Sequence, residues 1–296
     1  SLVVSGYDDG DVRVWNPATR SDARLPGHND TSEARYSAQG DHIVSWSRDG
    51  SLRLWDVRQR RSRLVTSGGP EVLAAAVDPT GSHVAFALLD GPSFIQAPDG
   101  AGKVELPFEA APTAFEFSPD GTRLVAGLED GTVQVVRVSN GETVRTEKAP
   151  GKIVDATFGP DGKRLAIAGA DGTIRVWPAG KAAPVVLFGH ERGVNTVAFN
   201  RAGDRLVSAG QDGSVRVWNA AGGVSLATVE SYDGNAPGAA FSPDGLRVVS
   251  ADARTRLLRT TPCEVCGPFA AVLQRAHSRP VRTLSVAERE RLLAGD

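Results

Sequence analysis

The chain has 296 residues, of which 41% are hydrophobic and 23% charged, and its formal net charge is −2. This balance excludes a broad positive field, so neither nucleic acid nor a membrane is an expected partner, and no run reaches the roughly 18 consecutive apolar residues of a membrane helix. Two cysteines cannot form a disulfide framework, whereas 33 glycines and 18 prolines between short apolar runs are typical of an all-β protein.

Short predicted strands and turns repeat along the chain with a period of about 41 residues. The dipeptide Asp-Gly has its aspartate at positions 9, 49, 90, 130, 171 and 212, and a tryptophan follows five residues after the glycine at 15, 55, 177 and 218. Asp-Gly favours a type I′ hairpin turn, in which both central residues have positive φ. A second turn, for example Ser-Pro-Asp-Gly at 118–121 and 242–245, has the proline and glycine positions of a type I turn.

One copy of the repeat shows how the strands divide. Residues 194–199, 205–209 and 214–218 form three short strand-like runs, and 185–188 form a weaker one. Four short antiparallel strands in about 40 residues make one blade of a β-propeller. We therefore predict an all-β, seven-bladed propeller over residues 1–261, in which the first blade lacks its innermost strand, and a C-terminal extension over residues 262–296.

The repeat resembles the WD40 repeat in Gly189-His190, Ser208, Asp212-Gly213 and Trp218, together with the Ser-Pro-Asp-Gly turns. The resemblance implies that the His, Ser, Asp and Trp of one repeat form a buried, hydrogen-bonded tetrad. The implied tetrads are His28, Ser45, Asp49 and Trp55; His190, Ser208, Asp212 and Trp218; and an incomplete one of Ser5, Asp9 and Trp15. Where the pattern decays, as at Ile167 in place of the serine, we expect apolar packing alone to hold the blade.

His190, Ser208 and Asp212 also have the composition of a hydrolase triad. A triad needs one exposed nucleophile beside a base, whereas these residue types recur in register with a tryptophan in several copies. We therefore predict a structural role and no catalytic residue. Each Asp-Gly turn offers one or two carboxylates, too few for a calcium loop, and no glycine-rich phosphate loop opens a helix, so neither a metal nor a cofactor is expected.

Cys263 and Cys266 have the spacing of half a zinc site or of a redox pair. The chain has no second cysteine pair, and His277 is the only histidine nearby. Buried thiols or a local disulfide are therefore the favoured interpretation, and a metal shared with another chain is the alternative.

The WD40 resemblance implies that partners dock on the face that carries the loops next to the tetrads. The candidate binding residues precede an Asp-Gly or follow the Gly-His position, and they mix both charges with aromatic rings, as protein-binding surfaces do. They are Tyr7, Asp8, Asn29, Asp30, Arg48, Glu129, Glu191, Arg192, Gln211, Tyr232 and Asp233. Trp46 replaces the small residue usual in the repeat, so it either fills a gap or is an exposed anchor.

The C-terminal extension allows two interpretations. Phe269, Val272, Leu273 and Ala276 have helical spacing, which predicts a helix over 268–277. For residues 281–293 there are two alternatives. Either a second helix forms at 286–293, after a capping box at Ser285 and Glu288, or residues 281–286 form the inner strand of the first blade. Closure of the ring requires an inner strand in the first blade, because an open blade leaves a sheet edge unpaired, and we expect either upstream sequence or this extension to supply it.

The tail from Cys263 to Glu288 is similar to the C-terminal end of bacterial STAND-type proteins, in which a nucleotide-binding switch domain precedes a WD40 sensor. The 28 arginines against five lysines are compatible with a bacterial genome, and the chain opens inside a strand-like run. We therefore predict a non-catalytic, cytoplasmic interaction module of a larger signalling protein, which binds a protein partner or its own upstream domain and takes no substrate.

Two alternatives to this function remain. One is a free-standing scaffold that joins several proteins. The other is an enzyme with its site in the central channel, which predicts convergent ionisable side chains on the inner strands. The inner strands offer few such residues apart from Glu116 and Asp155.

Overall fold

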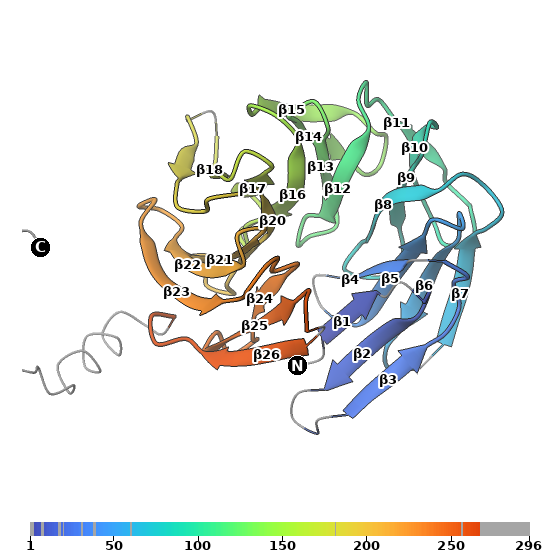
Figure 1. The fold of residues 1–296 in the computed structure, drawn as a ribbon. Helices are drawn as coiled ribbons and strands as arrows, with labels where there is room; N and C mark the ends of the chain where they lie inside the picture. Colours follow the sequence, from blue (N-terminus) through green and yellow to red (C-terminus); the bar gives the residue numbers. More distant parts are fainter. Residues whose placement is uncertain are drawn as a thin grey trace, which may run out of the picture.

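The computed structural model describes residues 3–6, 9–16, 19, 21–30, 32–37, 40–59, 61–180, 182–255 and 257–266. Every regular element among these residues is a β-strand, and the strands form seven antiparallel sheets that stand as blades around a common centre (Figure 1). The predicted all-β, seven-bladed propeller is therefore confirmed.

The blades follow one another in chain order, and five of them have four strands. Blade 1 contains β1 (Val3–Gly6), β2 (Val12–Asn16) and β3 (Ser21–Leu25); blade 2 contains β4 (Ser32–Tyr36), β5 (His42–Ser47), β6 (Leu52–Asp56) and β7 (Arg61–Thr66). Blade 3 contains β8 (Val72–Val77), β9 (Val84–Leu88), β10 (Ser93–Gln96) and β11 (Val104–Leu106); blade 4 contains β12 (Pro112–Phe117), β13 (Arg123–Leu128), β14 (Thr132–Arg137) and β15 (Thr143–Lys148). Blade 5 contains β16 (Ile153–Phe158), β17 (Leu165–Gly169), β18 (Ile174–Trp177) and β19 (Val185–Leu187); blade 6 contains β20 (Val194–Phe199), β21 (Arg205–Gly210), β22 (Ser214–Asn219) and β23 (Ser225–Ser231). Blade 7 contains β24 (Ala239–Phe241), β25 (Arg247–Asp252) and β26 (Leu257–Pro262).

The hydrophobic core lies between neighbouring blades. Trp218 and Leu206 of blade 6 form one buried cluster with Ala168, Ile174 and Val176 of blade 5. Both faces of a blade are therefore covered by its neighbours, which explains why the middle strands are apolar almost throughout, as in β17 with all five residues buried. This packing supplies stability without a single large core.

Trp46 belongs to such an interblade cluster. It lies on β5, is 4% exposed, and packs in a cluster with Val44 of its own blade and with Val72 and Phe86 of blade 3. Of the two roles considered for it, filling a gap is the one that the structure shows.

The Asp-Gly turns differ from the type I′ geometry predicted for them. Asp90 is the only non-glycine residue with positive φ among the described residues, so the aspartates of the other copies do not adopt that turn. At Asp49 the amide of Gly50 donates to the carbonyl of Ser47 at 3.2 Å, and the Asp49 carboxylate accepts the amide of Ser51 at 2.8 Å. The loop is a type I turn followed by a left-handed glycine, and aspartate is used for its carboxylate rather than for its tolerance of positive φ.

A close backbone approach requires glycine after four of these aspartates, at Gly10, Gly50, Gly131 and Gly213. At Gly213, with φ of +79°, a Cβ atom would stand 2.2 Å from the carbonyl oxygen of Tyr232 and 2.3 Å from that of Gly234. Gly180 has a similar φ of +87° but open space around it. Both positions require left-handed backbone, but only Gly213 also lacks the space for a Cβ atom.

We therefore expect Gly213→Ala to lower the free energy of unfolding by at least about 2 kcal/mol more than Gly180→Ala. Both variants force alanine into left-handed backbone, at about 1–2 kcal/mol, and only the first adds a clash with fixed carbonyl oxygens. Urea denaturation of the two variants measures the difference. Equal losses at the two positions would show that the backbone around Gly213 yields freely.

The first and last blades each have three strands within the described residues. β1 is followed by the Asp9-Gly10 turn as β5 is followed by Asp49-Gly50, so β1 holds the second position of its blade and no described strand fills the innermost one. The predicted helix over 268–277, the alternatives for 281–293 and the extension beyond 266 lie outside the described residues, and they stay predictions.

Candidate functional site

The residues of the tetrad in blade 6 are hydrogen-bonded to one another. His190, in the connection before β20, places Nε2 2.7 Å from the Ser208 hydroxyl of β21, and its Nδ1 lies 3.1 Å from both oxygens of Asp212. Trp218 on β22 donates its Nε1–H to the same Ser208 oxygen at 2.8 Å. These hydrogen bonds thus link a loop, a turn and two strands of one blade.

The corresponding group in blade 2 differs in how the histidine reaches the aspartate, because in blade 6 Ser214 lies 3.0 Å from His190 Nδ1 in addition to the direct contact with Asp212. His28 Nε2 lies 2.7 Å from the Ser45 hydroxyl, and Trp55 Nε1 donates to that hydroxyl at 2.8 Å. His28 Nδ1 contacts the hydroxyl of Ser51 at 2.6 Å, and Ser51 in turn donates to Asp49. Histidine and aspartate are therefore joined through a serine rather than directly.

The incomplete tetrad of blade 1 shows less of this pattern. The Asp9 carboxylate accepts the amide of Asp11 at 3.1 Å, the same turn contact that the other aspartates make. Trp15 is half-buried on β2. The side chain of Ser5 lies outside the described residues, so this tetrad stays a prediction.

Tyr232 is buried, and its assignment to the partner-binding surface is wrong. Its hydroxyl lies 2.6 Å from that of Ser250, and its ring packs with Val215, Val217 and Val248. Tyr232 follows His190 by one repeat and Ser250 follows Ser208 by the same interval, so tyrosine takes the place of the histidine in blade 7. Counting from the histidine position, rather than from the loop, would have identified it.

The electrostatics of the blade 6 tetrad favour a neutral histidine and an ionised aspartate. Burial lowers the pKa of His190, and the neighbouring Asp212 opposes that shift only in part. Burial raises the pKa of Asp212, but hydrogen bonds from the amides of Glu191 and Ser214 and from His190 outweigh it and hold that pKa at about 2. The group is a polar network whose members satisfy one another.

Nucleophilic catalysis does not fit this geometry. Ser208 is fully buried, and its oxygen is already shared between His190 and Trp218. A serine nucleophile must reach a substrate carbonyl from an exposed position beside an oxyanion site. The arrangement thus fastens the strands together and presents no exposed serine hydroxyl.

The candidate binding residues on the tetrad-side loops are mostly exposed. Exposed side chains are found at Asn29, Asp30, Arg48, Glu129, Glu191, Arg192, Gln211 and Asp233, whereas Tyr7 and Asp8 lie outside the described residues. Three of them make surface ion pairs: Arg48 with Glu71 at 3.6 Å, Glu129 with Lys152 at 2.9 Å, and Asp233 with Arg254. Such exposed pairs contribute little to stability, so their side chains are free to exchange partners.

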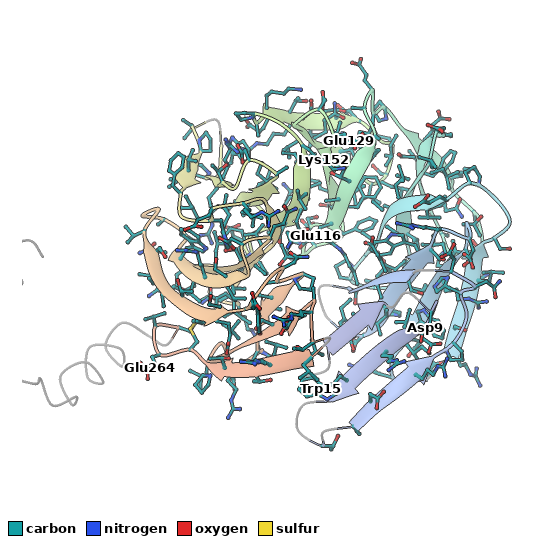
Figure 2. All side chains as sticks on the ribbon, in the orientation of Figure 1. Asp9, Trp15, Glu116, Glu129, Lys152 and Glu264 are labelled. Carbon is teal, nitrogen blue, oxygen red and sulfur yellow. A yellow bond between two sulfur atoms is a disulfide. The ribbon has the colours of Figure 1, made fainter. Side chains whose placement is uncertain are left out.

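Three ionisable side chains meet in the centre of the ring. Arg35 on β4 of blade 2 reaches across to Asp155 on β16 of blade 5, with Nη2 2.9 Å from Oδ1. Asp155 also accepts the amides of Ala156 at 3.0 Å and of Val197, from blade 6, at 3.1 Å. Glu116 on β12 lies beside them near the axis (Figure 2). The pair therefore bridges two blades that are not neighbours in the ring.

Arg35 is not among the residues predicted from the sequence, although the register of its strand places it in the channel. It pairs with Val44 on the neighbouring strand as Glu116 pairs with Val125 and as Thr157 pairs with Ala166, so the three occupy equivalent positions of their inner strands. Glu116 and Asp155 are the two ionisable residues that the channel-enzyme alternative named. Because Arg35 and two backbone amides already bind Asp155, the cluster neutralises itself.

Burial raises the pKa of Glu116 to about 8, although hydrogen bonding with Thr157 and the charge of Arg35 oppose the shift. Between about pH 4.5 and 8, the Glu116 carboxyl therefore keeps its proton in the folded protein, whereas the unfolded chain has already released it. This group's contribution to stability is complete below pH 4.5 and is lost as the pH rises to 8.

We expect Glu116→Gln to gain stability relative to the wild type as the pH rises from 5 to 8, because glutamine cannot ionise. Urea denaturation at several pH values measures this difference. The acid-side effects of His28 and His190 are common to both proteins and cancel. Exposed Glu129→Gln is the control, and a pH-independent difference for Glu116→Gln would contradict the prediction.

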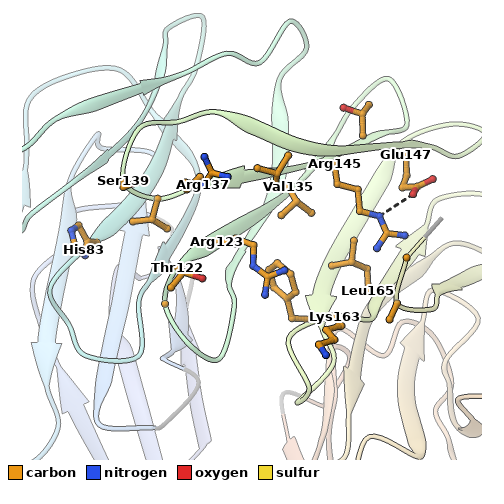
Figure 3. A pocket seen from close by; sticks show the side chains of 17 residues that line it. His83, Thr122, Arg123, Val135, Arg137, Ser139, Arg145, Glu147, Lys163 and Leu165 are labelled. Carbon is orange, nitrogen blue, oxygen red and sulfur yellow. Dashed lines mark hydrogen bonds and ion pairs between the residues drawn. The ribbon is translucent and has the colours of Figure 1, made fainter.

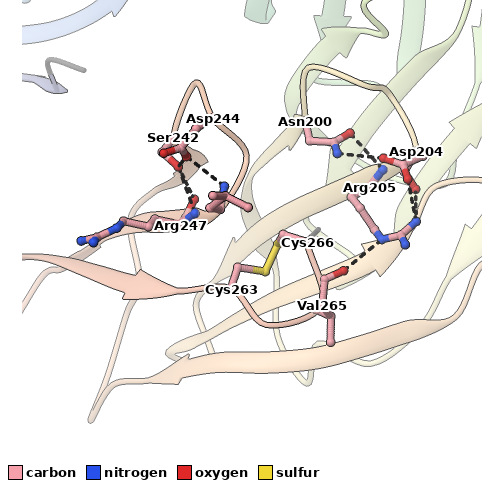
Figure 4. Close-up of a disulfide and its surroundings, with 10 residues drawn as sticks. Asn200, Asp204, Arg205, Ser242, Asp244, Arg247, Cys263, Val265 and Cys266 are labelled. Atoms are coloured by element: carbon pink, nitrogen blue, oxygen red, sulfur yellow. Dashed lines mark hydrogen bonds and ion pairs between the residues drawn. A yellow bond between two sulfur atoms is a disulfide. The ribbon is translucent and has the colours of Figure 1, made fainter. Parts of the chain in front are cut away.

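Cys263 and Cys266 form a disulfide at the end of β26 (Figure 4). Both are buried in the cluster that joins blades 6 and 7, and Arg205 of blade 6 donates from Nε to the carbonyl of Val265, between the cysteines, at 3.3 Å. This agrees with the local disulfide considered from the sequence.

Within the described residues no group of three or more His, Cys, Asp or Glu side chains is placed to hold a metal ion, and no helix is long and apolar enough to span a membrane.

Comparison with known proteins agrees with the repeat and the fold. The family model described as "WD domain, G-beta repeat" matches residues 20–56, 108–136, 141–178 and 183–219. The Cps50 (Swd1) β-propeller domain of Myceliophteria thermophila superposes with a TM-score of 0.77 at 20% sequence identity, covering 88% of this chain and 93% of that one. The chain therefore carries WD40 repeats on a seven-bladed propeller.

The match to this chain spans less than half the length of each of three curated relatives. Telomerase protein component 1 of Rattus norvegicus is 26% identical over 52% of this chain and 8% of its own length. Apoptotic protease-activating factor 1 of Homo sapiens is 24% identical over 47% of this chain and 12% of its own length. Small ribosomal subunit protein RACK1y of Oryza sativa subsp. japonica is 27% identical over 46% of this chain and 44% of its own length.

Proposed function

We propose that this WD40-repeat propeller is a non-catalytic protein-interaction module of a larger signalling protein, acting in the bacterial cytoplasm. The observation that carries the proposal is the division of its polar residues. Those with catalytic composition, such as Ser208 and His190, are buried and occupied by one another, while the loops beside them expose a mixed set of charges. A rigid ring with an adaptable polar rim suits recognition of a protein surface.

The lengths of two relatives support the proposal that this propeller is part of a larger protein. The matches to telomerase protein component 1 and to apoptotic protease-activating factor 1 span 8% and 12% of those chains. We propose the same arrangement here, with the propeller binding a partner or its own upstream domain through the tetrad-side loops. A free-standing scaffold is the alternative.

An immunoblot of lysate from the source organism distinguishes these two cases. An antibody raised against the propeller should detect a band well above the 31.1 kDa of this chain. A single band near 31 kDa would instead establish a free-standing scaffold.

The binding face is tested in the full-length protein with a photo-crosslinking amino acid. Placed at Gln211 or Arg192, it should give a discrete adduct with a protein partner or with the upstream domain. The control is Val224, which is 59% exposed on the outer side of blade 6 and away from these loops. Adducts of equal yield at all three positions, or only at Val224, would exclude the tetrad-side loops as the binding face.

A further inference from the structure

A groove of about 1220 Å³ runs between blades 4 and 5, away from the tetrad-side loops. We call it the blade 4–5 groove; its lining includes Arg123, Val135, Arg145, Glu147, Lys163 and Leu165 (Figure 3). It lies at the ends of the strands that carry the Ser-Pro-Asp-Gly turns, because residues 121–123, 163 and 179–180 border it. Antiparallel strands put these turns opposite the Asp-Gly turns, so the groove is separate from the candidate face above.

The groove exists because blade 5 is shorter than blade 4 at its outer edge. β14 and β15 have six residues each, whereas β18 has four and β19 three. The chain leaves β18 after Trp177 and passes through Ala179 and Gly180, and a methyl group and a hydrogen atom do not fill the space beside β15. The shortfall exposes part of Val144, at 43%, next to the charged residues.

The charge of the lining is opposite in sign to that of the chain. Four permanent cations, Arg123, Arg137, Arg145 and Lys163, line the groove with the single carboxylate Glu147, although the net charge of the protein is −2. Glu142, outside the lining, pairs with Arg137, and the Glu147 Oε1 accepts from Arg145 Nε at 2.9 Å. Arg123 also pairs with Asp120, outside the lining, at 3.8 Å, so Lys163 is the lining cation without an ion pair among the described residues.

Two side-chain nitrogens in the groove have N–H groups that can donate to a ligand. The Nη2 of Arg145 is buried and lacks a hydrogen-bond partner among the described residues. Lys163 is exposed, and its ammonium has no ion pair among the described residues. An unsatisfied buried guanidinium nitrogen is costly, so an acceptor that reaches it from outside gains more than one bound at the open surface.

We propose that the blade 4–5 groove binds an acidic peptide segment of a partner protein, with carboxylates at Arg145 and Lys163 and an apolar side chain against Val144 and Val135. Charge complementarity favours the acidic chain, and the alternation of cations with apolar side chains favours a peptide over a dense polyanion. Phe158 lines the groove but is 5% exposed, so its ring offers no face on which a nucleobase could stack. The inference rests on the proposed role in protein interaction and adds a second surface to it.

The test uses a fluorescein-labelled peptide in which leucine and valine are separated by pairs of glutamate, with binding to the propeller followed by fluorescence anisotropy. Wild-type protein should bind it, and Lys163→Glu and Arg145→Gln should each weaken binding about tenfold or more. Lys152→Glu makes the same charge change as Lys163→Glu at the opposite end of the blades, and it should leave binding within about twofold. Thermal unfolding shows whether each variant is folded; Lys163 lies on an exposed turn, so its substitution does not disturb the core.

The outcomes separate the groove from the proposed function. Equal weakening by Lys152→Glu, or no binding of the peptide, overturns the groove proposal. Binding of tripolyphosphate that is lost in Lys163→Glu, with no peptide binding, also overturns it and identifies a site for compact anions. If crosslinks at Gln211 persist in any of these cases, the interaction module stands and only the groove assignment fails.

Discussion

Replacing Arg35 by alanine should lower the free energy of unfolding by about 2–4 kcal/mol. Among the described residues, the guanidinium is the one side chain that binds the buried Asp155 carboxylate, and its removal leaves that charge with the amides of Ala156 and Val197. Blades 2 and 5 lie across the ring from each other, so the loss also removes a tie between its two halves. The estimate lies below that for a fully buried pair because the Arg35 side chain is 36% exposed.

A double-mutant cycle with Arg35→Ala and Asp155→Asn isolates the interaction. Each single variant should be clearly destabilised in urea, and the double variant should be less destabilised than their sum, because neither partner then leaves a buried charge alone. Arg58→Ala serves as the control, since Arg58 pairs with Asp41 at 2.9 Å but is 79% exposed, and it should cost less than about 1 kcal/mol. Additive losses would mean that Arg35 and Asp155 do not act as a pair.

The propeller could be predicted from the sequence because its information is periodic. A blade is defined by short strands and turns in fixed register, and the interval of about 41 residues repeats even where individual residues have changed. The turn type at Asp-Gly was mispredicted for a physical reason. The dipeptide suits two geometries, and the aspartate carboxylate, which accepts the amide two residues ahead at Asp49, Asp130 and Asp171, selects the one with a left-handed glycine alone.

The candidate site could be predicted only where a residue belongs to the repeat. His190, Ser208 and Trp218 meet as the resemblance implies, whereas the buried position of Tyr232 is not predicted because tyrosine is absent from the motif. The pair of Arg35 and Asp155 joins residues 120 positions apart on opposite sides of a ring. No local pattern encodes that distance, since it depends on how many blades close and on the width of the channel.

The tetrad of blade 6 gives the other large effect. Trp218 is fully buried between blades 5 and 6, and Trp218→Ala should cost about 3–5 kcal/mol through the cavity that it leaves. Trp218→Phe keeps most of the ring but deletes the Nε1–H that donates to Ser208. That deletion should account for about 1–2 kcal/mol of the loss.

Blade 5 supplies a matched control, because Trp177 is buried to 1% and Ile167 stands where blade 6 has Ser208. Trp177→Phe removes the same atoms without removing a bond to serine, so Trp218→Phe should be more destabilising than Trp177→Phe, as measured by urea denaturation. Ser208→Ala in the Trp218→Phe background should then cost less than in the wild type, because one of the two groups that the serine satisfies is already gone. Equal losses for the two phenylalanine variants would mean that blade 6, like blade 5, is held by apolar packing alone and that its polar tetrad adds no stability.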